Sequence, residues 1–413
     1  MFNSSIRYAA GQLHCDEVRV ADIAANTGTP VYIYSLRRVL ENFEGVRSAF
    51  APLDAHIHYS AKANGNLSIL RALVDAGAGI DAVSGGEIYR ALRAGAPPEN
   101  IVFAGVSKTI AELYFAVDQN IGWFNLENAH EAERLNSIAQ TAGKLVRVAV
   151  RLNPDVQAST HPHIATGHGG AKFGLSADAI QALYDRRADL PALSFEGLHI
   201  HIGSQLSDTG GTRQAAQAVV ELARSMPTIN TINIGGGIPV PYQSGAELPE
   251  ARRFAEALAP VLQGYRVLIE PGRSIVADAG LLVTRVQYLK EQGGARMVIV
   301  DAGMTDLIRP ALYDAYHAIV PLHEPEPGQA GQTVNVVGPV CETTDMLGRD
   351  ITMAVVSPND CLAILTTGAY GMVMSSNYNA RPRPPEVVVE PDGTTWRVAR
   401  RRETWDDLVA HEL

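Results

Sequence analysis

Lys62 follows a short alternation of apolar and polar residues that includes Ile57 and Tyr59. The alternation predicts a half-buried strand, and Gly65 indicates a turn just beyond the lysine. A lysine at the end of a buried strand is poorly hydrated, which favours its neutral form and makes it an amine nucleophile. A single lysine in such a place more often extends its ammonium into water. The chemical interpretation therefore depends on the rest of the chain.

Four other predicted strands also end in residues that could do chemistry. These ends contain Asp81 before Ser84-Gly85-Gly86-Glu87, the pair His199 and His201 before Gly203 and Ser204, the triplet Gly235, Gly236 and Gly237, and the segment Glu270, Pro271, Gly272 and Arg273. A lone triplet of glycines is usually only a loop. Five strand ends with polar or glycine-rich signals are better explained by a shared site, because active-site residues of α/β barrels gather where strands end.

Each of these residue types has a use around one ligand. The three glycines allow backbone N–H groups to close on a phosphate, and Ser204 adds a hydroxyl. A carboxylate such as Glu270 can keep a heteroaromatic nitrogen protonated, an imidazole can lie flat on a ring, and a lysine can form an imine with an aldehyde. Phosphate, protonated pyridine and aldehyde together describe pyridoxal 5'-phosphate, which stabilises carbanions.

Strands and helices that alternate along the first 273 residues must position these side chains. Eight such strands in about 250 residues are typical of a (β/α)8 TIM-type barrel. A doubly wound open sheet remains the alternative, because periodicity does not reveal whether a sheet closes. The predicted strands are 55–60, 79–83, 101–104, 121–126, 145–152, 195–202, 230–235 and 266–270, and the helices between them are 66–76, 85–94, 109–119, 128–142, 176–187, 210–226 and 247–262.

After Arg273 the pattern changes to strands separated by glycine and proline turns, which predicts a mostly antiparallel β-barrel or sandwich domain. We expect an N-terminal strand in residues 1–30 that joins this domain, a cofactor-binding barrel over 31–280, and the β domain over 281–413. The predicted strands are 280–289, 297–301, 333–337, 351–356, 361–366 and 386–400, followed by a helix at 404–412.

Composition excludes several classes of protein. The 413 residues carry a formal net charge of −10, so the chain lacks the excess of basic residues that is typical of nucleic-acid-binding proteins. Three cysteines, Cys15, Cys341 and Cys361, indicate reduced thiols in a cytoplasmic protein. The N-terminus lacks an apolar signal core, and no apolar run approaches the roughly 18 residues of a membrane helix.

The motifs resemble those of the fold-type III pyridoxal-phosphate decarboxylases, and within them most closely those of the enzymes that act on diaminopimelate. The resemblance runs from about residue 25 to the end. The motifs at 338–342 and at 368–371 with 375–384 separate the chain from the alanine racemases, which share the barrel. The motifs are 59–64 (YSAKAN), 201–205 (HIGSQ), 235–237 (GGG), 270–273 (EPGR), 301–313 (DAGMTDLIRPALY), 338–342 (GPVCE), and 368–371 (GAYG) with 375–384 (SSNYNARPRP).

The resemblance assigns roles to individual residues. It implies that Lys62 forms the imine with the cofactor, that His201 stacks on its ring, and that Glu270 pairs with its pyridine nitrogen. It implies that Cys341 is the proton donor. The phosphate is expected to contact Ser204, Gly235, Gly236, Gly237, the Pro271-Gly272-Arg273 backbone and Tyr370, and the substrate to contact Arg273, Arg309, Tyr313, Glu342 and Tyr370.

The reaction implied is decarboxylation of meso-2,6-diaminopimelate to L-lysine and carbon dioxide, the last step of lysine biosynthesis. The implied assembly is a homodimer in which Cys341 and Glu342 enter the partner's site. The alternatives are a relative that acts on ornithine, lysine or carboxynorspermidine, and a non-catalytic cofactor carrier or regulator. The chain has Thr343 and Thr344 after Glu342, where the family commonly has serine and then glycine or alanine, so we expect extra bulk beside the distal substrate pocket.

Two other sets of residues are given no catalytic role. His161, His163 and His168 suggest a zinc site, but no cysteine or carboxylate cluster nearby completes a tetrahedral set. The resemblance implies instead that this segment is a loop over the site. We take Cys15 and Cys361 as structural.

Overall fold

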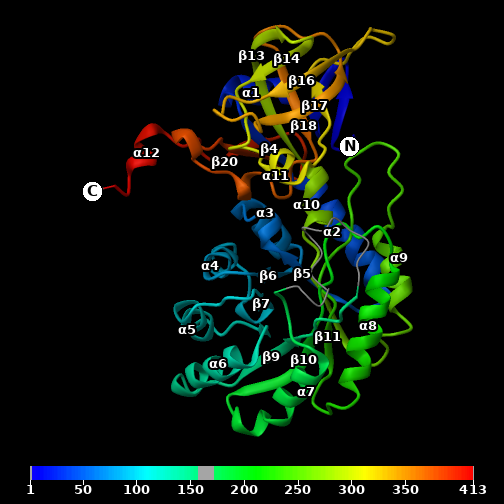
Figure 1. Cartoon of the computed structure of the whole chain (residues 1–413), viewed down its shortest axis with the longest axis vertical. Helices are drawn as coiled ribbons and strands as arrows, with labels where there is room; N and C mark the ends of the chain where they lie inside the picture. Colours follow the sequence, from blue (N-terminus) through cyan, green and yellow to red (C-terminus); the bar gives the residue numbers. More distant parts are fainter. Residues whose placement is uncertain (1, 157–171, 413) are drawn as a thin grey trace. The chain divides into compact units, whose positions relative to one another are not determined.

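The computed structural model describes residues 2–156 and 172–412 (Figure 1). The chain divides into two compact units. A barrel unit comprises residues 42–240 and 247–274, and a β unit comprises 1–41, 241–246 and 275–413. Among the described residues, no helix is long and apolar enough to cross a membrane.

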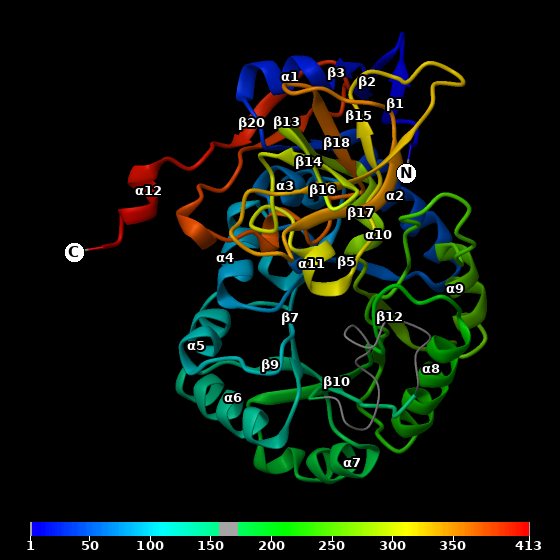
Figure 2. The ribbon, with the colours of Figure 1, turned by 45° about the horizontal axis from the view of Figure 1, so that its top comes forward.

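The barrel unit is built on eight parallel strands that close in the order β10-β11-β12-β5-β6-β7-β8-β9. Closure confirms the predicted (β/α)8 barrel and excludes the open sheet. Helices α4 to α9 surround these strands in Figure 2. The strands are β5 (His56–Ser60), β6 (Gly79–Ala82), β7 (Ile101–Phe103), β8 (Trp123–Leu126), β9 (Val146–Arg151), β10 (Leu193–His199), β11 (Thr231–Asn233) and β12 (Arg266–Ile269). The helices are α3 (Leu67–Asp75), α4 (Gly85–Arg93), α5 (Ile110–Asp118), α6 (Ala129–Thr141), α7 (Ala177–Asp185), α8 (Gly210–Ala223) and α9 (Ala251–Leu258).

Several barrel helices begin at a side chain that accepts a hydrogen bond from the first turn. Asn66 caps α3, Ser84 caps α4, and Thr109 forms a reciprocal capping box with Glu112 at α5. Such caps satisfy backbone N–H groups that have no partner within the helix. The cap at Asn66 also fixes where the loop that contains Lys62 ends.

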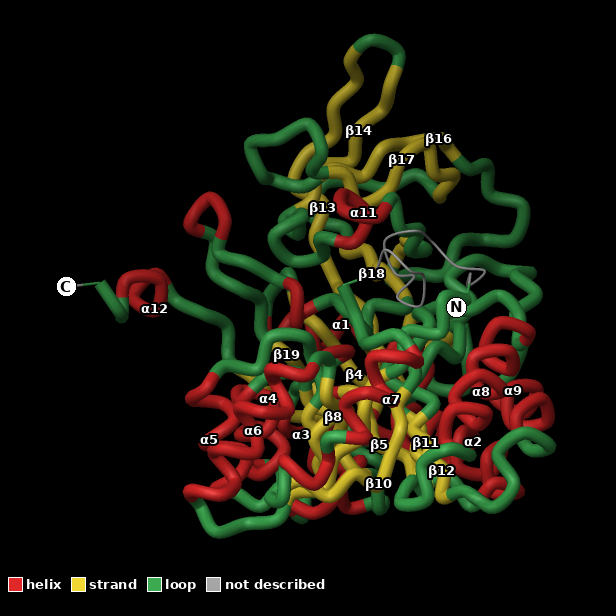
Figure 3. Tube along the Cα trace, turned by 60° about the horizontal axis from the view of Figure 1, so that its bottom comes forward, coloured by secondary structure: helices red, strands yellow, loops and turns green. Residues whose placement is uncertain are grey.

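The β unit contains a nine-stranded sheet and a small three-stranded sheet. Most pairs in the large sheet are antiparallel, as predicted, although β14 with β16 and β4 with β19 are parallel. Strands appear yellow and helices red in Figure 3. The strands are β1 (Ile6–Ala9), β2 (Gln12–Cys15), β3 (Val18–Arg19), β4 (Val31–Ser35), β13 (Gly280–Gln292), β14 (Ala295–Val300), β15 (Ile319–Pro321), β16 (Gln332–Val337), β17 (Met346–Met353), β18 (Cys361–Leu365), β19 (Glu386–Val389) and β20 (Trp396–Arg400). The helices are α1 (Val20–Thr27), α10 (Arg273–Val276, at the boundary between the units), α11 (Arg309–Tyr313) and α12 (Trp405–Val409); α2 (Leu36–Phe50) crosses from this unit into the barrel unit.

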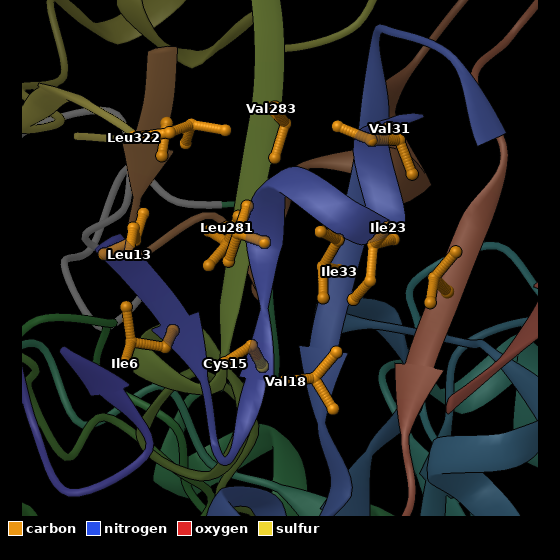
Figure 4. Packing of buried hydrophobic residues seen from close by; sticks show 14 of the residues in the cluster. Ile6, Leu13, Cys15, Val18, Ile23, Val31, Ile33, Leu281, Val283 and Leu322 are labelled. Carbon is orange, nitrogen blue, oxygen red and sulfur yellow. The ribbon is translucent and has the colours of Figure 1, made fainter. Parts of the chain in front are cut away.

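The core of the β unit includes side chains from both ends of the chain. Figure 4 shows Leu13 and Cys15 in one apolar cluster with Ile33 and Leu281. Cys15 is fully buried there, which agrees with a structural role. The N-terminal segment therefore packs with the β domain.

The domain boundaries differ from those we expected. The β unit includes residues 31–41, 241–246 and 275–280, which we assigned to the barrel from the sequence. Strand β4 is buried throughout and pairs with β13 and β19. A fully buried strand has the same apolar pattern in either sheet, so periodicity could not show which sheet it joins. The predicted strand 386–400 is also two strands, β19 and β20, joined by a turn.

Candidate active site

Lys62 lies in a single 3-10 turn directly after β5. Its Nζ donates to Asp81 Oδ2 at 2.7 Å and to Ser60 Oγ at 3.1 Å. Asp81 is fully buried at the end of β6, the strand next to β5. Burial raises the pKa of the Asp81 carboxyl, the charge of Glu270 adds to this effect, and Lys62 opposes it. The lysine is thus held by a buried carboxylate, a pairing that the sequence did not predict.

Glu270 follows β12 and is held by side chains from three other strands. Its Oε1 accepts from Asn233 Nδ2 at 2.6 Å and from Asn125 Nδ2 at 3.3 Å, and its Oε2 lies 3.4 Å from His199 Nε2. Burial alone would raise the pKa of Glu270. His199, the charge of Lys62 and the Asn233 hydrogen bond outweigh burial and lower that pKa well below its usual range. Glu270 is therefore ionised.

Sequence reasoning missed Asn125 and Asn233 as supports of Glu270. Both are buried, and each stands between two apolar residues of the sequence, Asn125 within β8 and Asn233 as the last residue of β11. A buried amide requires hydrogen-bond partners, so an isolated asparagine in an apolar strand was a usable signal.

The glycine triplet after β11 passes close to Glu270 and His201. A Cβ on Gly236 would lie 2.4 Å from the Glu270 carbonyl oxygen, and a Cβ on Gly237 would lie 2.6 Å from Leu206 Cδ1. Gly237 also has a φ of +119°, which side chains rarely allow. Only glycine lets the backbone approach its neighbours so closely.

His201 is oriented by the same triplet. Its Nδ1 accepts a hydrogen bond from the Gly236 N–H at 3.1 Å, so the ring is a neutral imidazole with its hydrogen on Nε2. Burial lowers the pKa of His201 well below its usual value, and the positive charges of Arg151 and Lys62 lower it further. His201 therefore presents an uncharged aromatic ring.

Arg273 and Ser204 meet beside the triplet. Arg273 Nε and Nη2 each lie 3.2 Å from Ser204 Oγ, which accepts from the guanidinium. Gly272 lies next to Ser60, because a Cβ there would be 2.9 Å from Ser60 Cβ. The barrel unit thus brings the predicted residues from β5, β10, β11 and β12 to one place.

These residues fit pyridoxal phosphate. A phosphate can bind to the backbone N–H groups of the glycine triplet, where no Cβ blocks its approach. The Ser204 hydroxyl and the Arg273 guanidinium can also donate hydrogen bonds to it. An ionised, buried Glu270 suits a protonated pyridine nitrogen, and a neutral imidazole suits the face of a ring. Among the described residues, three buried polar atoms near Lys62 and Glu270 have no hydrogen-bond partner: His199 Nδ1, Asn125 Oδ1 and Asp81 Oδ1. These atoms can still form hydrogen bonds with a ligand.

The remaining predicted residues belong to the β unit. Cys341 is exposed, and its N–H donates to Asn379 Oδ1 at 3.1 Å. Glu342 accepts from Tyr378 Oη at 2.5 Å and from Thr344 Oγ1 at 3.2 Å. Thr344, expected from the sequence only to add bulk, thus supplies a hydroxyl that holds Glu342.

Arg309 and Tyr313 begin and end α11, and Arg309 is buried. Tyr370 has a backbone φ angle of +56°, in the left-handed region that residues other than glycine rarely adopt.

The three histidines His161, His163 and His168 lie outside the described residues. Within the described residues, no group of three or more histidine, cysteine and acidic side chains could hold a metal ion.

The chain is similar in sequence and in structure to known proteins. Residues 36–277 match the family described as pyridoxal-dependent decarboxylase, pyridoxal binding domain. A diaminopimelate decarboxylase of Aquifex aeolicus is 43% identical over 100% of this chain and 98% of its own, and one of Vibrio cholerae is 42% identical over 97% of each chain. The crystal structure of the Helicobacter pylori diaminopimelate decarboxylase complexed with L-lysine has a TM-score of 0.90 at 38% identity, covering 95% of this chain and 98% of its own.

A closed barrel with this lysine, glycine triplet and carboxylate, together with the match over 36–277, defines a pyridoxal-phosphate enzyme of the decarboxylase class. The chain belongs to the diaminopimelate decarboxylase family.

Proposed function

We propose that this enzyme decarboxylates meso-2,6-diaminopimelate at its D-configured centre and releases L-lysine and carbon dioxide, as the last step of lysine biosynthesis. The observation that carries the proposal is the group formed by Lys62 with Asp81 and by Glu270 with Asn233 and His199. The full-length similarity to diaminopimelate decarboxylases supports the choice of substrate.

The cofactor, when bound, accepts the electron pair that the departing carboxylate leaves behind. Lys62 would supply the amine that attaches it, and Asp81 and Ser60 hold Nζ in place. Glu270, kept ionised, holds the proton on the pyridine nitrogen. His201 would offer the face of its uncharged ring to the cofactor ring.

The Gly235–Gly237 backbone, Ser204, Arg273 and Tyr370 would hold the phosphate. The Pro271-Gly272 backbone would lie beside it. Backbone N–H groups, hydroxyls and a guanidinium all donate hydrogen bonds, which is what a phosphate requires.

Arg273 of the barrel unit and several residues of the β unit would recognise the substrate and complete the reaction. Arg309 and Arg273 pair with the carboxylate that the substrate retains, since guanidinium groups bind carboxylates in a fork. Glu342 pairs with the amine at that end, and Tyr313 and Tyr370 add hydroxyls. The thiol Sγ of Cys341 gives its proton to the carbon that lost the carboxylate.

We further propose a homodimer in which each site combines Lys62 of one chain with Cys341 and Glu342 of the other. Cys341 and Glu342 are both exposed, as expected of residues that act in a partner's site. A cytoplasmic location is part of the proposal, and the three free cysteines support it.

Carbon dioxide release with meso-diaminopimelate, ornithine and lysine tests the substrate. We expect kcat/KM for the meso isomer to exceed that for ornithine by at least about a hundredfold, because ornithine leaves a buried guanidinium without its carboxylate. Comparable values would instead identify a relative that acts on ornithine, and release from lysine alone would identify a lysine decarboxylase.

A further inference from the structure

The Arg309 guanidinium is held by a buried histidine. Arg309 Nη1 lies 2.8 Å from His317 Nε2, and the exposed fractions of the two residues are 7% and 2%. His317 stands between α11 and β15, eight residues after Arg309. None of the motifs or comparisons assigns it a role.

Two contacts fix the protonation state of His317. Its Nδ1 lies 2.9 Å from the Leu365 carbonyl oxygen, which can only accept, so Nδ1 carries hydrogen. A guanidinium can only donate, so Nε2 must offer its lone pair to Arg309. Both ends of the ring therefore require the neutral tautomer with its hydrogen on Nδ1.

Tyr242 holds the same two side chains from another side. Its ring meets the His317 ring edge-on, with centroids 5.2 Å apart and an interplanar angle of 84°. Arg309 Cζ lies 4.7 Å from the centroid of the Tyr242 ring, within the range of a cation–π contact. The guanidinium is thus restrained both by a hydrogen bond and by an aromatic ring.

The type of residue at position 317 matters for binding an anion. A carboxylate there would pair with Arg309 and compete with any carboxylate ligand. A neutral imidazole and a phenol ring orient the guanidinium without cancelling its charge. Orientation in advance reduces the entropy lost when a ligand binds.

We propose that His317 is a positioning residue that presents the Arg309 guanidinium to the carboxylate retained by both substrate and product. The inference rests on the proposed function, in which Arg309 binds that carboxylate. It adds a specificity determinant that lies behind the arginine and acts through it.

L-lysine and cadaverine are the probes that isolate this effect, because cadaverine lacks the carboxylate. The measurement is the dissociation constant of each from the holoenzyme by titration calorimetry, with carbon dioxide release from meso-diaminopimelate as a second readout. In His317→Leu we expect lysine to bind about ten- to a hundredfold more weakly, the range of a lost charge-assisted hydrogen bond. Cadaverine affinity should change less than about threefold.

Two amide variants separate positioning from simple structural support. His317→Gln places an amide oxygen near the position of Nε2 and can still accept from Arg309. His317→Asn places its amide NH2 near the position of Nδ1, so it keeps the bond to Leu365 but does not reach Arg309. We expect Gln to restore lysine binding to within about threefold of the parent enzyme and Asn to resemble Leu.

Arg309→Met is the reference that tests the function on which the inference rests. If it leaves the lysine-to-cadaverine preference intact, Arg309 does not bind the carboxylate and the proposed role of Arg309 fails. If it abolishes the preference while His317→Asn retains it, the inference about His317 alone is overturned. The Gln and Asn pair decides the question even if His317→Leu does not fold, since equal behaviour of the two amides would also overturn it.

Discussion

At the scale of single residues, charge and proton placement explain the site. Asp81 holds Lys62 in place, and His199 with Asn233 keeps Glu270 ionised although it is buried. Without those partners a buried carboxyl would become neutral and could no longer stabilise a protonated pyridine.

Lys62→Ala should abolish turnover and the yellow absorbance of the attached cofactor, because no other group supplies the amine in the proposed site. Absorbance spectra of the purified variant and carbon dioxide release provide the measurements. Lys290→Ala is a suitable control, since Lys290 is exposed on β13. A yellow, active Lys62→Ala enzyme would remove this lysine from the mechanism.

Cys341→Ala should slow turnover and favour protonation at the wrong atom, because the proposed thiol donor is gone. The signature is cofactor released in its amine form, which chromatography of the reaction mixture detects. Cys361→Ala is the control, because Cys361 lies on β18 and has no proposed catalytic role. Full activity of Cys341→Ala without cofactor loss would mean that another group delivers the proton.

At the scale of elements, loops that follow the strands set the distances. The glycine triplet after β11 lies against Glu270 after β12 because the two strands are parallel neighbours. Parallel strands end at the same edge, so side chains far apart in sequence meet there.

Gly236→Ala should weaken cofactor binding by about five- to a hundredfold, because its Cβ would lie 2.4 Å from the Glu270 carbonyl and overpacking typically costs 1–3 kcal/mol. Titration of the apoenzyme with cofactor, followed by absorbance, measures the change. Gly45→Ala is the matched control: a Cβ there meets nothing within 4 Å, and alanine favours a helix such as α2. Equal cofactor affinity in the two variants would contradict the close approach.

At the scale of the whole molecule, the proposed chemistry uses residues from both units. Lys62 belongs to the barrel unit, and Cys341 belongs to the β unit. If each site takes Cys341 from the other chain, twofold symmetry gives two shared sites per dimer.

Mixing Lys62→Ala with Cys341→Ala chains tests this sharing. In a mixed dimer one site carries both lesions and the other carries neither, so random exchange should leave about a quarter of all sites intact. Activity of the co-expressed mixture is compared with that of each variant alone. No recovery, with exchange verified by a tag pull-down, would show that the sites are not shared in this way.

The sequence by itself determined the order of strands and helices and the chemistry at the strand ends. Lys62, the glycine triplet and Glu270 stand out because a polar residue or a run of glycines interrupts an apolar pattern at a predictable place. The motifs then identified the cofactor and the family. Local patterns suffice for these features because buried positions favour apolar residues and turns favour glycine and proline.

Only the tertiary structure decided which groups are partners. Closure of the barrel, the pairing of Asp81 with Lys62 and the assignment of β4 to the β unit all depend on contacts between distant segments. The same holds for His317, whose tautomer is set by Arg309 and by Leu365, 48 residues further along the chain. The periodicity of apolar residues in a sequence indicates which side chains are buried, but it does not show which residues they contact. Hydrogen bonding and the charge state of a buried polar group depend on those contacts.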